Sequence, residues 1–265
     1  MASDPLPFDP HRFITAAVHY RAGRVPYQTA LIRRGAEAVG LRDADRGLDL
    51  GCGPGQLAIG FGYFAGDVIG LDPEPRMLAA ATAAALGLTP NVQFRQGRSY
   101  SLDGTLGRFR LVTMGRSFHW MDRAATLERL DEMIERDGAV ALFHDTHLEA
   151  PESDWRKRWR EIIERCASDD PLREQRRAGT WRSHDAVLLQ SPFCRLERLS
   201  LVRRQVSTTQ SLTERALSMS STSRARIGER VDSLLHDLSR LLAEVAPGGT
   251  VTEVLEWSAL IARRQ

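Results

Sequence analysis

Residues 47–59 read GLDLGCGPGQLAI, a short apolar run that breaks into closely spaced glycines and then continues with a helical pattern. Asp49, Gly51, Gly53 and Gly55 stand at every second position of this stretch. Glycine has no Cβ and tolerates positive φ angles, so it suits sharp turns and places where a ligand approaches the backbone. The stretch therefore predicts the end of a strand, a tight turn and the start of a helix.

The residues around this turn alternate between strand-like and helix-like patterns. Strands are expected at 46–51, 67–72, 91–97, 109–115 and 139–145, and helices at 54–64 (with Pro54 in the first turn), 73–88 and 122–136, the last ended by Gly138. Such alternation favours a parallel sheet covered on both faces and wound by right-handed crossovers. Ligands of open parallel sheets bind beyond the carboxyl ends of the strands, where the glycine turn lies.

Further elements are expected on both sides of this unit. They are one or two helices within 13–40 broken at Pro26, a helix at 154–166, a strand at 193–207, a helix with a capping box at Ser211 and Glu214, an amphipathic helix at 227–242 and a closing strand at 251–264. No internal repeat or low-complexity linker separates them. We therefore expect one compact domain with added helices.

Composition limits the partners and the compartment. The 265 residues hold 36 Lys and Arg against 34 Asp and Glu, and this net charge of +2 gives little attraction for nucleic acid or anionic membranes. Cys52, Cys166 and Cys194 lack the spacing of a metal or redox motif. No apolar run approaches the roughly 20 residues of a membrane span, and residues 1–13 lack the apolar core of a signal peptide. We expect a cytoplasmic protein that binds neither membrane nor nucleic acid.

The glycine turn and a second acid indicate a nucleoside-containing cofactor. Asp72 ends the second expected strand, 21 residues after Gly51, where a carboxylate can accept hydrogen bonds from both ribose hydroxyls. The helix after the glycines directs unpaired N–H groups and its positive dipole end toward an anion. The segment GPGQLA at 53–58 also fits the looser dinucleotide fingerprint, so these features alone leave a nicotinamide cofactor open.

The sequence LDLGCGPG at 48–55, followed by VIGLDPEPRML at 68–78, resembles the first two motifs of class I S-adenosylmethionine-dependent methyltransferases. This resemblance implies a Rossmann-like, doubly wound, mainly parallel seven-stranded sheet with S-adenosylmethionine as cofactor. It implies that Gly51, Gly53 and Gly55 lie along the methionine part of the cofactor, that Asp72 holds the ribose, and that Pro73 and Met77 flank the adenine.

A second resemblance extends the comparison over most of the chain. RSFHWMD at 116–122 and HYRAGRVPY at 19–27 are similar to segments of the small-molecule branch that contains trans-aconitate methyltransferases. It implies N-terminal lid helices that fold over the cofactor. The cofactor-binding residues expected in total are Tyr20, Arg24, Asp49, Gly51, Gly53, Gly55, Gln56, Asp72, Pro73, Met77, Gly97, Arg98, Ser99, Arg116, Phe118 and Trp120.

Two departures from the family pattern concern the adenine and the fourth strand. Members of the family commonly carry an acid after the third strand, near Arg98, that accepts from the adenine amino group; here the stretch reads QGRSYSL. Adenine then relies on backbone groups, Ser99 or stacking. The fourth strand commonly begins with an aspartate, and Arg110 stands there instead.

Methyl transfer from a sulfonium is an in-line displacement, for which a protein supplies alignment, exclusion of water and, where needed, removal of a proton. Aromatic faces at Tyr20, Phe118 and Trp120 can stabilise the sulfonium charge. His119 is the candidate general base for a hydroxyl acceptor, and alternatively it only contacts the cofactor or shapes the pocket. A carboxylate acceptor needs no base, only arginines such as Arg24 to position it.

FHDTH at 143–147 offers His144, Asp145 and His147 as metal ligands, but no further ligand is evident, so we expect a pocket wall and no metal. The run GRSFHWMD at 115–122 differs from the Asn/Asp-Pro-Pro-aromatic run with which amino-methylating enzymes hold a flipped base. A small-molecule acceptor is therefore expected.

The sequence thus predicts an enzyme that methylates an oxygen, hydroxyl or carboxylate, of a small molecule, as a monomer or homodimer. The expected domain covers 1–265, with lid helices at 1–40, a cofactor-binding core at 41–150, acceptor-pocket helices and a strand at 151–249, and a closing strand at 250–265. The alternatives are a cofactor-binding regulator without catalysis and an NAD-dependent oxidoreductase.

Overall fold

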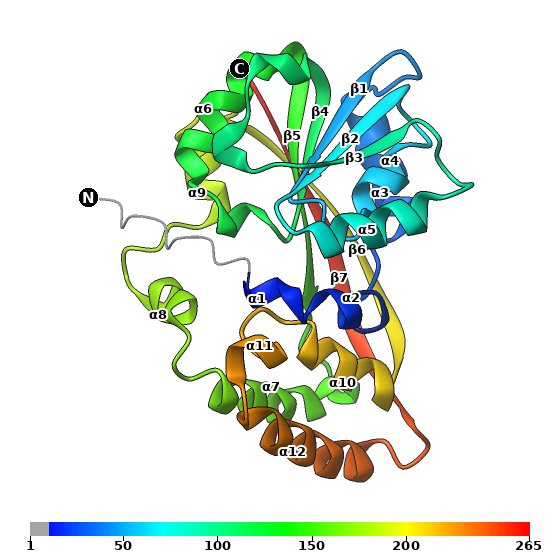
Figure 1. Cartoon of the computed structure of the whole chain (residues 1–265), viewed down its shortest axis with the longest axis vertical. Helices are drawn as coiled ribbons and strands as arrows, with labels where there is room; N and C mark the ends of the chain where they lie inside the picture. Colours follow the sequence, from blue (N-terminus) through cyan, green and yellow to red (C-terminus); the bar gives the residue numbers. More distant parts are fainter. Residues whose placement is uncertain (1–10) are drawn as a thin grey trace.

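A computed structural model describes residues 11–265, which are built on one seven-stranded sheet (Figure 1). The strands are β1 (Arg46–Leu50), β2 (Asp67–Asp72), β3 (Val92–Gln96), β4 (Phe109–Gly115), β5 (Ile134–His147), β6 (Arg195–Thr208) and β7 (Thr250–Arg263). Their order is β3-β2-β1-β4-β5-β7-β6. β1 to β5 pair in parallel, whereas β7 runs antiparallel to β5 and β6. The predicted mainly parallel, seven-stranded fold is confirmed.

Helices cover both faces of this sheet because side chains along each strand alternate between the faces. The covering elements are α3 (Thr29–Val39), α4 (Gln56–Phe61), α5 (Pro75–Ala85), α6 (Arg123–Met133), α9 (His184–Leu189) and the 3-10 turns η1 (Ser99–Ser101), η2 (Gly104–Leu106) and η3 (Phe118–Trp120). Leu48 of β1 packs in one buried cluster with Leu127 of α6. Leu111 of β4 belongs to the other cluster, with Leu31 of α3 and Phe61 of α4.

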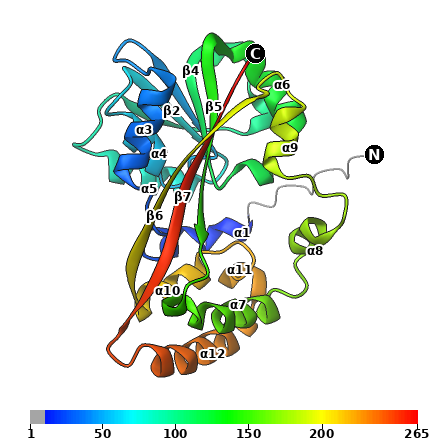
Figure 2. The same ribbon diagram turned by 180° about the vertical axis from the view of Figure 1, so that it is seen from behind.

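A helical lobe lies beyond the carboxyl ends of the parallel strands. It is formed by α7 (Trp155–Cys166), α10 (Thr209–Leu217), α11 (Arg224–Ile227) and α12 (Arg230–Val245), while η4 (Pro151–Ser153) and α8 (Pro171–Arg177) lie on its connections. β5, β6 and β7 have 14 residues each and run from the sheet down to this lobe (Figure 2). Trp159, Leu212 and Leu238 are among the residues of its separate buried core.

The lid helices α1 (His11–Ile14) and α2 (Ala17–Gly23) lie between the sheet and the helical lobe (Figure 1). Residues 1–10 of the predicted lid lie outside the described residues. α2 packs on α10 so closely that a Cβ on Gly23 would collide with the backbone of Arg215. Nδ1 of His19 lies 2.6 Å from Oε2 of Glu214. The lid is therefore docked on the lobe.

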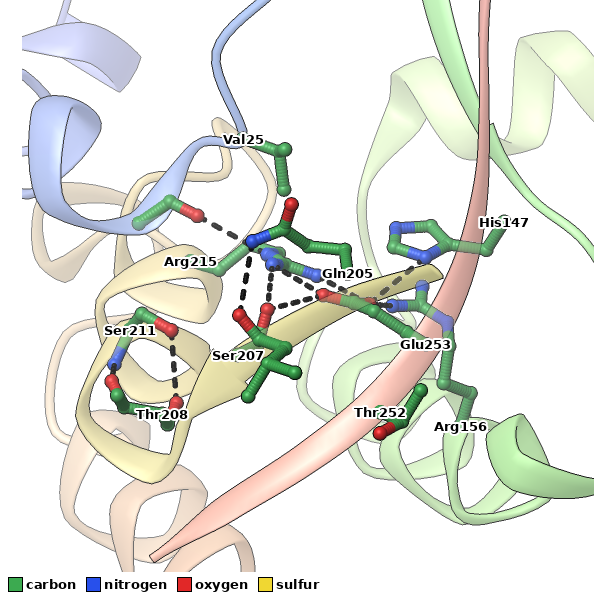
Figure 3. Close-up of polar contacts among 12 residues, drawn as sticks. Val25, His147, Arg156, Gln205, Ser207, Thr208, Ser211, Arg215, Thr252 and Glu253 are labelled. Atoms are coloured by element: carbon green, nitrogen blue, oxygen red, sulfur yellow. Dashed lines mark hydrogen bonds and ion pairs between the residues drawn. The ribbon is translucent and has the colours of Figure 1, made fainter. Parts of the chain in front are cut away.

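One buried carboxylate connects the lobe, the long strands and the lid (Figure 3). Glu253 of β7 is fully buried and accepts hydrogen bonds from Arg156 (3.0 Å), Ser207 (2.5 Å) and Arg215 (2.8 and 2.9 Å). Nδ1 of His147 lies 3.1 Å from its Oε2. Nε of Arg215 in turn donates to the Gly23 carbonyl, at 3.1 Å. Although burial alone would raise the pKa of Glu253, these hydrogen bonds and the Arg215 charge hold it well below its usual value.

Several predicted boundaries are confirmed and others are wrong. The helix expected at 227–242 is divided, because α11 ends at Ile227 and α12 begins only at Arg230, after a Gly228 with positive φ. β2 and β4 cover the predicted residues. α6, however, ends at Met133, and Gly138 lies inside β5, because buried Ile134 already pairs with Phe109 and the ladder shifts register beyond it. α4 begins only at Gln56, after a left-handed Gly55, so Pro54 lies in the turn before the helix.

The predicted capping box of α10 is also wrong. The cap is Thr208, whose hydroxyl accepts a hydrogen bond from the backbone N–H of Ser211 at 3.0 Å. Glu214 pairs with His19 of the lid instead of turning back to the helix start. The Glu214 side chain, which the local pattern assigned to the helix cap, therefore forms a tertiary contact with the lid instead.

Removing the charge of Glu253 should destabilise the chain, because Arg156 and Arg215 would stay buried without a counter-ion. We expect Glu253→Gln to lower the free energy of unfolding by roughly 3–5 kcal/mol in denaturant titrations. Glu256→Gln, on the same strand, is the matched control, since Glu256 forms no ion pair among the described residues. A Glu253 variant as stable as this control would contradict the role given to the carboxylate.

Candidate functional site

The glycine turn after β1 has the predicted left-handed backbone, and its three glycines lack a side chain for two different reasons. The φ angles of Gly51, Gly53 and Gly55 are 69°, 53° and 80°. A Cβ on Gly51 would lie 2.5 Å from the Cβ of Ser117, and one on Gly55 would lie 2.8 Å from the ring of Phe94. A Cβ on Gly53 would meet nothing within 4 Å. Close packing against neighbouring side chains thus requires glycine at positions 51 and 55, whereas Gly53 faces open space.

Asp72 is fixed beside this turn by two backbone donors. Its Oδ2 accepts from the N–H of Gly53 at 2.8 Å and its Oδ1 from the N–H of Glu74 at 2.9 Å. The residue is 8% exposed, and burial raises the pKa of its carboxyl. Each carboxylate oxygen still has a lone pair for a ligand hydroxyl. The carboxylate is therefore preoriented where β2 ends.

Asp49 lies beneath the turn and organises it. Its Oδ2 accepts from the N–H of Ala58 in α4 at 3.0 Å, and its Oδ1 accepts from the hydroxyl of Thr113 in β4 at 2.9 Å. Burial raises the pKa of Asp49 to about 7, against the lowering effect of these two hydrogen bonds. Asp49 thus ties the first strand to the following helix and to the neighbouring strand.

A cavity of about 290 Å³ opens at this carboxyl edge. It is lined by the predicted residues Tyr20, Gly51, Gly53, Asp72, Pro73, Met77, Gly97, Arg98, Ser99, Arg116 and Trp120. A small annex of about 20 Å³ shares Tyr20 and the glycine turn and is lined by two more predicted residues, Asp49 and Gln56. The structure therefore brings together, from five segments of the chain, most of the residues that the sequence predicted.

Other lining residues were missed by sequence reasoning. They are Phe13, Leu50, Tyr100, Gly115, Ser117, Met121, Asp122, Thr126 and Arg129. Ser117, Met121 and Asp122 lie in the segment between β4 and α6, so their position after a strand end was a usable signal. Phe13 comes from the lid, where its ring packs edge-on against Trp120 at 5.1 Å between centroids, and nothing local in the sequence indicates that contact.

The side chains of three predicted residues, Phe118, His119 and Trp120, point to different places because η3 is a 3-10 turn. With three residues per turn, its successive side chains leave in three directions. Phe118 enters the main core, where it is 2% exposed. Trp120 lines both this cavity and a second, larger cavity of about 440 Å³, whereas His119 lines the second cavity and not the first. Phe118 and the candidate base His119 thus lie outside the first cavity.

Arg24 and Gly55 also lie outside the cavity lining, although Arg24 reaches its wall. Nη2 of Arg24 donates to the carbonyl of Ser218 at 3.3 Å, and its guanidinium lies 5.4 Å from the ring centre of Tyr20. Its buried Nε has no hydrogen-bond partner among the described side chains and backbone. Burial lowers the pKa of Arg24.

Arg116, which lines the cavity, carries a second N–H group that has no described hydrogen-bond partner. It is the one non-glycine residue with positive φ (56°) in the described part of the chain. Its Nε pairs with Asp145, Nη2 donates to the carbonyl of Val25 at 2.8 Å, and the guanidinium lies 4.5 Å from the ring centre of Tyr27. Its buried Nη1 has no hydrogen-bond partner in the described structure. Two buried guanidiniums, one of which lines the cavity, thus each keep one N–H group without a described acceptor.

The candidate metal ligands of 143–147 are engaged elsewhere. Asp145 pairs with Arg116, and His147 with Glu253. The described side chains include no group of three His, Cys, Asp or Glu that could hold a metal ion. No helix within residues 11–265 is both long and apolar enough to span a bilayer.

Comparison with known proteins points to one family. Residues 48–138 match the family model of a methyltransferase domain. An uncharacterized methyltransferase of Mycobacterium tuberculosis is 29% identical over 174 residues, which cover 66% of this chain and 62% of that protein. The chain thus aligns with less than two thirds of that relative's length.

Solved structures share the fold over nearly the whole chain. A methyltransferase of Thiobacillus denitrificans in complex with S-adenosylhomocysteine has a TM-score of 0.54 at 14% identity, over 98% of this chain and 100% of that one. A methyltransferase of Geobacter sulfurreducens, in the same kind of complex, has a TM-score of 0.54 at 16% identity, over 98% and 100%. At these identities the likeness shows the fold alone.

The raised pKa of Asp49 predicts a loss of stability as pH rises. The folded chain holds the Asp49 proton more tightly than the unfolded chain, so stability falls from about pH 4 to pH 8, and a pKa of about 7 against 3.8 corresponds to roughly 4 kcal/mol. Asp49→Asn keeps the shape of the side chain and removes this titration. We expect denaturant titrations to show a flatter stability profile for Asp49→Asn and higher stability at pH 8.

The exposed Asp43→Asn serves as control for the loss of one carboxylate. We expect this control to keep the pH dependence of stability that the unmodified chain shows. If Asp49→Asn also keeps it, the group that titrates is not Asp49.

Proposed function

We propose that this chain, which carries a class I methyltransferase domain, transfers a methyl group from S-adenosylmethionine to an oxygen of a small-molecule acceptor. The observation that carries the proposal is the pairing of Gly53 and Asp72 in one cavity. Gly53 presents bare backbone to open space, and its N–H fixes the Asp72 carboxylate at 2.8 Å. Together they suit the amino-acid tail and the ribose of that cofactor.

The cofactor supplies an activated methyl group on a sulfonium. In this proposal Asp72 accepts from the ribose hydroxyls, and Tyr20 and Gln56 lie toward the amino-acid tail. Pro73, Met77 and 97–99 surround the adenine. All of these residues line the cavity or its annex.

The buried guanidiniums support binding of a carboxylate at the tail end of the cavity. The Nη1 of Arg116 and the Nε of Arg24 are buried without partners in residues 11–265. An unsatisfied buried donor costs about 1–3 kcal/mol, which an anionic oxygen would recover. In the proposed reaction, two ligands carry a carboxylate that could bind these guanidiniums: the amino-acid tail of the cofactor and an acidic acceptor.

Aromatic side chains would hold the sulfonium and exclude water. Tyr20, Phe13 and Trp120 line the cavity from the lid and from η3. A cation above an aromatic ring gains about 0.5–2 kcal/mol, more where water is excluded. Alignment of the donor with the acceptor then supplies most of the rate acceleration.

The described residues favour a carboxylate over a hydroxyl acceptor. Among the side chains that the structure describes, no histidine, lysine or cysteine lines this cavity. Although burial opposes it, the charge of Arg116 keeps the pKa of Asp145 low, and burial raises the pKa of Tyr27, so neither is a base near neutral pH. A carboxylate is nucleophilic without losing a proton, and His119 could act as base only for an acceptor that reaches the second cavity.

Replacing Asp72 tests the cofactor assignment. We expect Asp72→Ala to weaken S-adenosylhomocysteine binding roughly tenfold or more in calorimetric titrations, since hydrogen bonds to a charged group contribute about 1.5–3 kcal/mol. Asp67→Ala, at the opposite end of the same strand, is the matched control. NAD titrated in parallel tests the oxidoreductase alternative. Unchanged affinity in Asp72→Ala, or tighter binding of NAD, would defeat the proposal.

Replacing His119 tests the acceptor chemistry. A panel of carboxylic acids and alcohols is first screened with methyl-labelled cofactor to find an acceptor. Because His119 lines the second cavity, we expect His119→Ala to keep turnover within about threefold and the pH profile of kcat unchanged. A hundredfold fall in kcat, with cofactor binding intact, would instead assign the base to His119.

A further inference from the structure

The adenine end of the cavity lacks the acid after β3 that the resemblance implies. Arg98, Ser99 and Tyr100 stand there. A guanidinium has donors only and cannot accept from an amino group. Nη1 of Arg98 instead donates to the Tyr100 hydroxyl at 2.9 Å. If the cavity holds the cofactor of the proposed function, on which this inference rests, no carboxylate after β3 is there to accept from the amino group, and a carboxylate of another element could take that role.

The sheet order places the loop after β4 at the same cavity. β1 lies between β2 and β4, so the segments after β2 and β4 approach the cavity from opposite sides of β1. Met77 follows β2 and Met121 follows β4, and both line the cavity. Thioethers make favourable contacts with aromatic rings, so the two methionines suit a flat base between them.

Asp122 adjoins Met121 and lines both this cavity and the second one. Its Oδ1 accepts from the N–H of Ala125 at 3.1 Å and thereby caps α6. No residue of the described chain donates to its Oδ2. An ionised carboxylate only accepts hydrogen bonds, and the exocyclic amino group of adenine only donates them.

We propose that Asp122 reads the adenine amino group and so selects the cofactor's base, replacing the acid that is missing after β3. One oxygen of this exposed side chain caps the helix, and the other is left to accept from a ligand in the cavity that Asp122 lines. In a base with a carbonyl in place of the amino group, the carbonyl oxygen would face the Asp122 carboxylate, and neither group could donate a hydrogen bond to the other. Discrimination between the two bases thus depends on Asp122.

The test compares S-adenosylhomocysteine with S-inosylhomocysteine, in which hypoxanthine replaces adenine, by calorimetric titration. We expect the unmodified chain to prefer the adenine compound at least roughly tenfold, as sites built around one hydrogen-bonding group do. In Asp122→Asn, the amide oxygen can keep the cap and the NH₂ group then faces the cavity. We expect this variant to narrow the preference to about threefold or to reverse it.

Glu128→Gln is the matched control, because Glu128 is an exposed acid on α6 that lines only the second cavity. It should keep the full preference, and circular dichroism checks that α6 persists in both variants. A full preference retained by Asp122→Asn would overturn the inference while leaving the proposed function standing. Binding of neither compound by the unmodified chain would overturn both, and equal binding of the two would overturn the inference alone.

Discussion

The hydrogen bond from Gly53 N–H to the Asp72 carboxylate, at 2.8 Å, is the contact on which the site depends. It joins the turn after β1 to the end of β2 and leaves bare backbone beside an oriented carboxylate. Gly51, Gly55 and Asp49 surround it with packing and hydrogen bonds that shape the turn. The proposed cofactor site depends on this contact, because a ligand bound here can meet the carboxylate and the open backbone together.

The helical lobe matters for function because the lid is attached to it. Glu253 holds Arg215, and Arg215 holds the Gly23 carbonyl at the end of α2. The lid also reaches the sheet, where Arg116 donates to the Val25 carbonyl. The cavity is thus closed by a segment that is bound on one side to the lobe and on the other to the strand ends.

The sequence predicted the parallel core well because its signals are local. β2 and β4 are buried apolar runs bounded by turn residues, and strand ends in a parallel sheet meet at one edge, which brings Gly53 and Asp72 together. Contacts set by distant segments were not predictable. In the 3-10 turn η3, the His119 side chain lies outside the first cavity, which Trp120 lines. Glu214 pairs with His19 of the lid and does not cap α10, and the ring of Phe13 packs on that of Trp120.

A crystal structure determined with S-adenosylhomocysteine bound tests the central claim most directly. We expect the ribose hydroxyls to lie within hydrogen-bonding distance of both Asp72 oxygens and the amino-acid tail to lie against the backbone of Gly53. Density for the compound in another cavity, or in this one with Asp72 uncontacted, would contradict this claim.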